Sequence, residues 1–200
     1  MIFYLYNRTQ TKEVVLRICE DEIVKENVRH FKKEKERNKM SMEKLIASKI
    51  KEVLDERNWN YEFDEELEYF EFGVRVQNPI RRLSYIIAAE DDCFTVVAGI
   101  PVSVDIAEDE KMKTMMEFLH RVNFGMKKGC FEFDAEDGEI RFKVHVDCED
   151  IVPSNAMIEN SIAISERMVF LYGEGIVGII YGGYSAEEAI RKTEDKILQH

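Results

Sequence analysis

Residues 129–146 read GCFEFDAEDGEIRFKVHV, two runs of alternating apolar and polar residues on either side of an Asp-Gly pair. In the first run Phe131 and Phe133 point the same way, and the second run alternates from Ile140 to Val146. An Asp-Gly pair between such runs is a strong signal for a hairpin turn. The stretch therefore predicts an antiparallel hairpin with one buried face.

The polar face of this hairpin carries charges of both signs. Glu132 and Asp134 lie on the first strand, and Arg141, Lys143 and His145 lie on the second. Opposite charges on neighbouring strands stabilise a sheet when they face each other. We expect these side chains to pair across the strands on the solvent side.

The same reading along the chain gives the remaining elements. Three more strands are predicted over Phe70–Val76, Leu83–Ala89 and Cys93–Ile100, with an acidic turn at residues 90–92. Helices are predicted from Ser41 to about Asn58, from Glu108 to Val122, from Pro153-Ser154 onward with Gly173 or Gly175 ending or loosening it, and from the capping box at Ser185 to about Leu198. The order α-β-β-β-α-β-β-α-α predicts an α+β fold, with an antiparallel sheet of about five strands and helices packed on it.

Charge divides the chain unevenly. The net charge is −12, yet residues 1–40 hold 10 Lys or Arg against 7 Asp or Glu, leaving 18 against 33 in the other 160 residues. The stretch 25–39 is almost empty of large apolar residues and cannot anchor a core alone. We therefore expect a charged extension over 1–40 and an α+β domain over 41–200. An acidic domain repels phosphate backbones, so nucleic-acid binding is not expected, although solubility also explains the charge.

Composition also narrows the compartment. No apolar run approaches the length of a membrane helix, and residues 1–6 lack the basic start of a secretory signal. Four scattered cysteines, without a C-x-x-C pair, fit neither a disulfide framework nor a zinc pattern. These features predict a cytoplasmic protein with reduced thiols and no membrane partner.

Four segments resemble the YbjN family, whose members adopt a type III secretion chaperone-like fold. The segments are the helix end Met116–Phe124, the hairpin Gly129–Phe142, the helical stretch Ile158–Tyr172 and the segment Gly182–Ile190. The resemblance covers about residues 41–193 and rests on patterning and glycine placement. It implies an α+β domain that pairs with itself and binds protein segments, and it involves no catalytic signature.

Two motifs suggest other chemistry but lack the necessary context. Gly173–Gly178 fits G-x-G-x-x-G, yet the dinucleotide fingerprint must follow a strand, and here it follows a helical pattern. A helix-end or close-packing role is the alternative. His145, Asp147 and Cys148 could begin a metal site but have no matched second pair. We therefore expect no metal, no cofactor and no catalytic residues.

Methionines and aromatic residues are the candidate binding residues. Met112, Met115 and Met116 lie in one amphipathic helix, and such soft side chains suit adaptable surfaces. Phe70 and Phe72 lie in the first predicted strand and could form an exposed patch. Ordinary core packing is the alternative for all five.

These observations favour a non-catalytic, chaperone-like adaptor that forms a homodimer and binds a protein or peptide partner. Binding would use an apolar helix–sheet surface or an open sheet edge. One alternative is a small-molecule-sensing regulatory domain. The other is an enzyme whose site forms only in the dimer. An apolar groove would favour the adaptor, and a closed pocket with converging polar groups would favour the alternatives.

Overall fold

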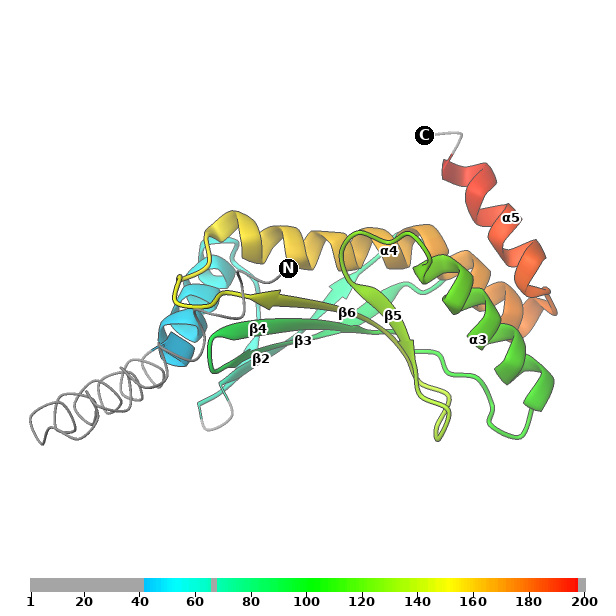
Figure 1. The fold of residues 1–200 in the computed structure, drawn as a ribbon, viewed down its shortest axis with the longest axis horizontal. Helices are drawn as coiled ribbons and strands as arrows, with labels where there is room; N and C mark the ends of the chain where they lie inside the picture. The colour runs from blue at the N-terminus through cyan, green and yellow to red at the C-terminus, as the bar shows by residue number, and fades with distance from the viewer. Residues whose placement is uncertain (1–41, 66–67, 198–200) are drawn as a thin grey trace, which may run out of the picture. The chain divides into compact units, whose positions relative to one another are not determined.

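The computed structural model describes residues 42–65 and 68–197. Residues 42–56 are helical, and the elements that follow, drawn in Figure 1, are β1 Glu62–Asp64, β2 Tyr69–Arg75, β3 Arg82–Glu90, β4 Cys93–Gly99, α3 Asp109–Asn123, β5 Cys130–Phe133, β6 Ile140–Asp147, α4 Asn155–Gly182 and α5 Ala186–Ile197. The predicted α+β class and the order of the predicted elements are confirmed. The charged extension expected over residues 1–40 lies outside the described residues.

The strands form one antiparallel sheet with the order β1-β2-β3-β4-β6-β5. The sheet has six strands, so the predicted count of about five is one too low. The missed strand, β1, is three residues long and has a single apolar side chain, Phe63, stacked 4.4 Å from the ring of Phe70. A strand this short shows no alternation that a sequence pattern could reveal.

The β5–β6 hairpin forms as the sequence predicts. Glu132 faces Arg141 in the register, and its carboxylate accepts a hydrogen bond of 2.8 Å from the Arg141 Nε and also pairs with Lys143. The turn needs a glycine at position 138, where φ is +76° and a Cβ would lie 2.0 Å from the carbonyl oxygen of Val104. The predicted cross-strand ion pairing of Glu132 is confirmed.

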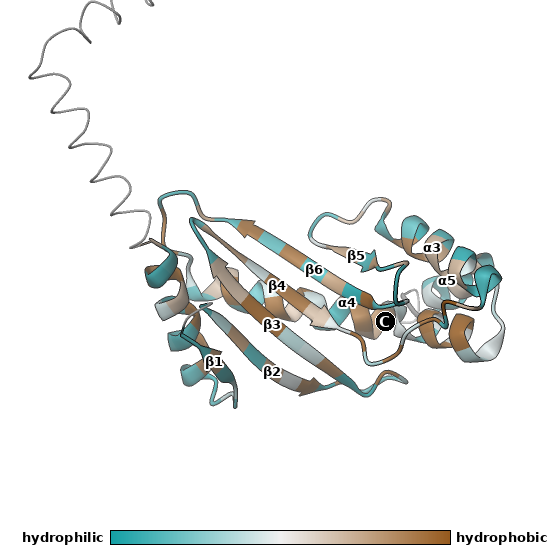
Figure 2. Cartoon of the chain, turned by 90° about the horizontal axis from the view of Figure 1, so that it is seen from below, coloured by the Kyte–Doolittle hydropathy of each residue, from teal (hydrophilic) through white to brown (hydrophobic). Residues whose placement is uncertain are grey.

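The two faces of the sheet differ. Side chains alternate along every strand, and one set is buried under the helices, as in Leu83, Tyr85 and Ile87 of β3. Figure 1 shows α4 lying along this face, and Figure 2, which views the sheet from below, shows β2, β3, β4 and β6 with no described helix in front of them. We call this second side the open face. It carries the outward side chains of β2 to β6, with Ile86 and Val97 near its centre.

Helix α4 is longer than expected. It begins at the predicted cap, where the Ser154 hydroxyl accepts a 3.3 Å hydrogen bond from the backbone N–H of Met157. It then continues through Gly173 and Gly175, so neither glycine ends it. A Cβ at Gly175 would lie 2.6 Å from the ring of Phe118, which explains the glycine as a close contact between α4 and α3.

Candidate functional site

The five candidate binding residues separate into two groups. Phe70, Phe72, Met112 and Met115 are buried, with exposed fractions between 0% and 7%. Met116, on the other side of α3, is 41% exposed. The four buried side chains pack in the core and present little surface in this conformation. Their role in binding a partner stays a prediction, and Met116 is the member of the set that a partner can reach.

Phe72 is a buried residue that contacts both a core side chain and a side chain at the surface. Its ring lies 5.1 Å from that of Tyr85 on β3 and 4.9 Å from that of Trp59, which is only half-buried. The Tyr85 ring is stacked on Phe72, whereas the Trp59 ring meets Phe72 edge to face, and both arrangements are favoured geometries for aromatic pairs. Trp59 is therefore held in a defined position at the boundary between core and solvent.

A cleft of about 360 Å³ opens beside Trp59, between the helix over residues 42–56 and the first half of α4. It is lined by Val53, Leu54, Arg57, Trp59, Glu159, Asn160, Ile162, Ala163 and Glu166. Val53, Leu54 and Ile162 are buried and supply apolar surface, whereas Arg57 is exposed and Glu159 and Glu166 are half-buried. An apolar side chain fits such a site, with polar or charged groups kept at the rim.

Charges at the rim are not balanced. Arg57 and Glu159 neutralise each other through an ion pair of 2.6 Å. Glu166 forms no ion pair with any described residue, and its charge acts on Tyr85 below the cleft. Burial first, and then the Glu166 carboxylate, raise the pKa of Tyr85. The Tyr85 hydroxyl therefore stays protonated and donates a 3.4 Å hydrogen bond to the carbonyl oxygen of Ile162. The rim thus keeps one negative charge available to a cationic ligand.

The edge of β2 next to this cleft is open. Strand β1 pairs only with Tyr69–Glu71, so no described strand pairs with the second half of β2. The Val76 N–H donates a 2.9 Å hydrogen bond to the carbonyl oxygen of Arg81, toward the β3 side. Backbone groups alternate in direction along a strand, so those of Gly73 and Arg75 point away from β3. Among the described residues these groups have no strand partner, so they form a free edge that can receive another strand.

Trp59 connects the edge and the cleft, because it lines the cleft and contacts Phe72 of β2. A strand added beside Gly73 and Arg75 would turn alternate side chains toward the helix side of the sheet, where the cleft lies. Sequence reasoning did not find this site. In the sequence Trp59 and Tyr61 follow the first predicted helix as two nearby aromatic residues, but no pattern shows that β1 stops short or that residues 159–166 pack near residues 53–59.

The alternative chemistries find no geometric support. His145 and Asp147 lie on the open face, whereas Cys148 is buried, so the three side chains do not converge. Across the described ranges no group of three His, Cys, Asp or Glu residues is placed to hold a metal ion. The glycines of the G-x-G-x-x-G stretch lie inside α4 rather than between a strand and a helix.

The thiol of Cys93 is in an acidic environment at the start of β4. Burial raises its pKa, and the carboxylates of Glu90, Asp92 and Asp147 raise it further. A nucleophilic cysteine needs a thiolate, which nearby positive charge would favour. The surroundings of Cys93 keep it as a neutral thiol.

In the described part of the chain no helix is both long and apolar enough to cross a membrane.

No protein-family model matches the chain, and no curated protein matches it. YbjN from E. coli, a proposed transcription regulator, aligns with 8% identity and a TM-score of 0.44 over 67% of this chain and 87% of YbjN. A chain of the ExsC–ExsE complex aligns with 15% identity and a TM-score of 0.35 over 64% of this chain and 86% of its own length. Similarities at this level carry no argument about what this chain binds.

Proposed function

We propose that this chain is a non-catalytic, chaperone-like adaptor of the YbjN type, which binds an extended segment of a partner polypeptide and works as a homodimer in the cytoplasm. The observation that carries the proposal is the free edge of β2 beside the Trp59 cleft. Backbone hydrogen bonds at a sheet edge supply affinity for an extended chain. Pockets for alternate side chains supply specificity.

The length of the free edge and the volume of the cleft set the size of the segment that the site can bind. Strand β2 extends four residues beyond its pairing with β1, from Phe72 to Arg75. A segment of about four residues therefore adds as a strand, which is within the usual range for short strands. One of its side chains enters the cleft, whose volume of about 360 Å³ holds a large apolar group.

Charge adds a second requirement. Glu166 at the rim forms no ion pair with a described residue, and the whole chain has a net charge of −12. A segment with Lys or Arg next to its apolar residue is attracted to this surface, and an acidic one is repelled. The expected ligand is an extended segment in which apolar and basic residues alternate. Met116 on α3 remains a proposed additional contact for a longer partner.

The arrangement of the cleft favours a polypeptide over the two alternatives. Polar groups that bind a small molecule or perform catalysis converge inside a pocket. Here Val53, Leu54 and Ile162 provide apolar surface, and Arg57 and Glu159 satisfy each other at the rim. An apolar groove beside a free sheet edge suits a side chain carried by an extended backbone.

The test selects short peptides from a random displayed library on the full chain and measures their affinity by fluorescence. Trp59 is the single tryptophan of the chain, so its emission reports directly on the cleft. Gly73→Pro removes an N–H that points to the free edge, and an edge strand tolerates the change. Gly73→Ala is the matched control, because it adds a Cβ at the same place, 2.7 Å from the end of the Arg82 side chain, and keeps the N–H.

We expect selected peptides to alternate apolar and basic residues, to change the Trp59 emission, and to bind Gly73→Ala. Binding to Gly73→Pro should be at least about tenfold weaker, because a hydrogen bond at the free edge is lost. Equal binding to the two variants would reject strand addition. A library that yields no peptide above background would reject the polypeptide-binding function itself.

A further inference from the structure

The open face carries a row of residues whose chemistry changes from one side of the sheet to the other. The register aligns Glu71 on β2, Ile86 on β3, Val97 on β4 and Lys143 on β6. The row is acidic at one end, apolar in the middle and basic at the other. Ile86, at its centre, is 42% exposed, although it is β-branched and apolar.

A second row has the opposite order of charges. Arg75 lies at the end of β2, opposite Arg82 of β3. Continued two residues past Gly99, the β3–β4 and β4–β6 registers bring Glu139, which directly precedes β6, into the same row two strands away from Arg82. Asp134 lies next to it and donates its N–H to the carbonyl oxygen of Glu139 over 3.0 Å. The row is therefore basic on the β2 side and acidic on the β6 side.

Together these rows make the face complementary to itself. A twofold axis that runs parallel to the strands, between β3 and β4, places β2 of one copy over β6 of the other and β3 over β4. Glu71 then faces Lys143 of the second copy, and Arg75 faces Glu139 of the second copy. Ile86 packs on Val97 of the second copy. Each contact occurs twice, and each brings together opposite charges or two apolar side chains.

We infer that the open face joins two copies of this chain, face to face, into a sandwich of two sheets. Aligned sheets pack about 10 Å apart and cross at about 30° because each is twisted. The twist displaces the outer contacts by about one residue, which long Arg, Lys and Glu side chains can span.

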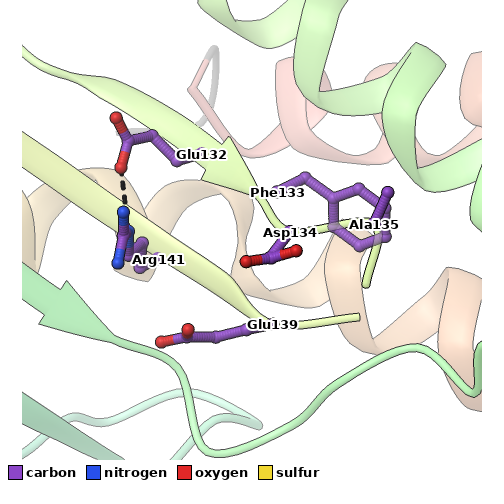
Figure 3. Close-up of a pocket in the computed structure, with 6 residues that line it drawn as sticks. All are labelled: Glu132, Phe133, Asp134, Ala135, Glu139 and Arg141. Carbon is purple, nitrogen blue, oxygen red and sulfur yellow. Dashed lines mark hydrogen bonds and ion pairs between the residues drawn. The ribbon is translucent and has the colours of Figure 1, made fainter. Parts of the chain in front are cut away.

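The β5–β6 hairpin supplies the receiving pocket for Arg75. A depression of about 490 Å³ is lined by Glu132, Phe133, Asp134, Ala135, Glu139 and Arg141. Figure 3 shows the side chains of Glu132, Asp134, Glu139 and Arg141 pointing to the same side of the hairpin. Arg141 donates a hydrogen bond to Glu132, and the two charges compensate each other. The carboxylates of Asp134 and Glu139 then give the depression a negative charge. A guanidinium from a second copy fits its charge.

This inference rests on the proposed function for the existence of a homodimer, and it assigns the face that forms it. It leaves the proposed peptide site accessible. In the sandwich the free edge of β2 stays at the side of the assembly, and the Trp59 cleft stays on the helix side. The dimer therefore offers two separate peptide sites, one on each copy.

Sedimentation velocity of the full chain tests the inference with two charge reversals, Arg75→Glu and Glu139→Arg. Each variant alone places like charges at both symmetric contacts, so its dimer should dissociate at a concentration at least about tenfold higher than the wild type. An equal mixture of the two variants restores opposite charges at both contacts. We expect the mixture, with one variant fluorescently labelled, to form a heterodimer as tight as the wild-type dimer.

Arg191→Glu is the control, because it makes the same charge change at an exposed position on α5 and should leave the dimer unchanged. A monomeric wild type would overturn the inference, and so would two variants that dimerise like the wild type or a mixture that stays monomeric. Peptide binding measured through Trp59 separates the two proposals. Glu139→Arg is the variant for this comparison, because Arg75 itself lies on the free edge of β2. A monomeric Glu139→Arg chain that still binds peptide leaves the adaptor function standing, and a dimer that binds no peptide rejects that function alone.

Discussion

Ile86 and Ile87 are neighbours in β3, yet they lie on opposite sides of the sheet and in different environments. Ile87 is fully buried under the helices, whereas Ile86 is 42% exposed on the open face. The same residue type therefore contributes to the stability of the fold on one side and is available for association on the other. One strand encodes both properties because its side chains alternate.

Replacing each isoleucine in turn gives the largest expected difference. Ile87→Ala leaves a cavity in the core and should lower the free energy of unfolding by about 2–5 kcal/mol. Ile86→Ala should lower it by less than about 1 kcal/mol when measured below the concentration at which copies associate. Urea unfolding followed by circular dichroism measures both values. Similar losses for the two variants would show that the open face is not a separate surface.

A second contrast concerns the helices that cover the buried face. A Cβ at Gly178 of α4 would lie 2.1 Å from the ring of Tyr184, whereas one at Gly182 would lie 3.3 Å from it. Gly178→Ala should lower the free energy of unfolding by about 1–2 kcal/mol, because overpacking outweighs the better helix propensity of alanine. Gly182→Ala, at an exposed position, should change it by less than about 0.5 kcal/mol. Thermal unfolding of the two variants compares them directly.

The smallest expected effect is on the open face itself and depends on pH. Partial burial alone raises the pKa of the Glu132 carboxyl, but the hydrogen bonds from Lys143 and Arg141 together outweigh it and hold that pKa below its ordinary value of 4.5. A lowered pKa in the folded state means that the ion pairs stabilise the fold above about pH 4.5. That contribution disappears as the pH falls through the folded value.

Glu132→Gln should therefore lower the free energy of unfolding by about 1 kcal/mol at neutral pH, since two exposed partners contribute modestly. The difference from the wild type should become smaller as the pH is lowered from neutral to 3. Urea unfolding at both pH values provides the measurement, with Glu136→Gln on the exposed turn as the control. A difference that is equally large at the two pH values would mean that Glu132 acts through packing rather than charge.

Alternation made the sheet predictable. Residues such as Phe131, Phe133 and Ile140 specify both the strands and their buried face, and the Asp-Gly pair specifies the turn. Strand β1 could not be predicted, because three residues with one aromatic side chain carry no period. Its pairing with β2 depends on contacts of Phe63 with Phe70 that only the fold creates.

Features that depend on contacts between residues far apart in the sequence could not be predicted. The glycines of α4 look like helix ends in sequence, and only the positions of Phe118 and Tyr184 show why the helix continues through them. The periodicity around Met115 predicts a buried stripe or a binding stripe equally well. The Trp59 cleft joins parts of the chain about a hundred residues apart, since Arg57 pairs with Glu159. A linear pattern does not carry that information.

The late position of α4 has a consequence for how the protein is made. Every strand of the sheet precedes residue 155 in the chain, and α4, which packs on β4 and β6, follows them all. A chain synthesised only as far as residue 154 therefore carries all six strands without this helix, and apolar sheet surface left exposed in this way promotes aggregation. The helix over residues 42–56 and α3 precede residue 155 and can pack before α4 is complete, whereas the parts of β4 and β6 that α4 covers stay exposed until it is.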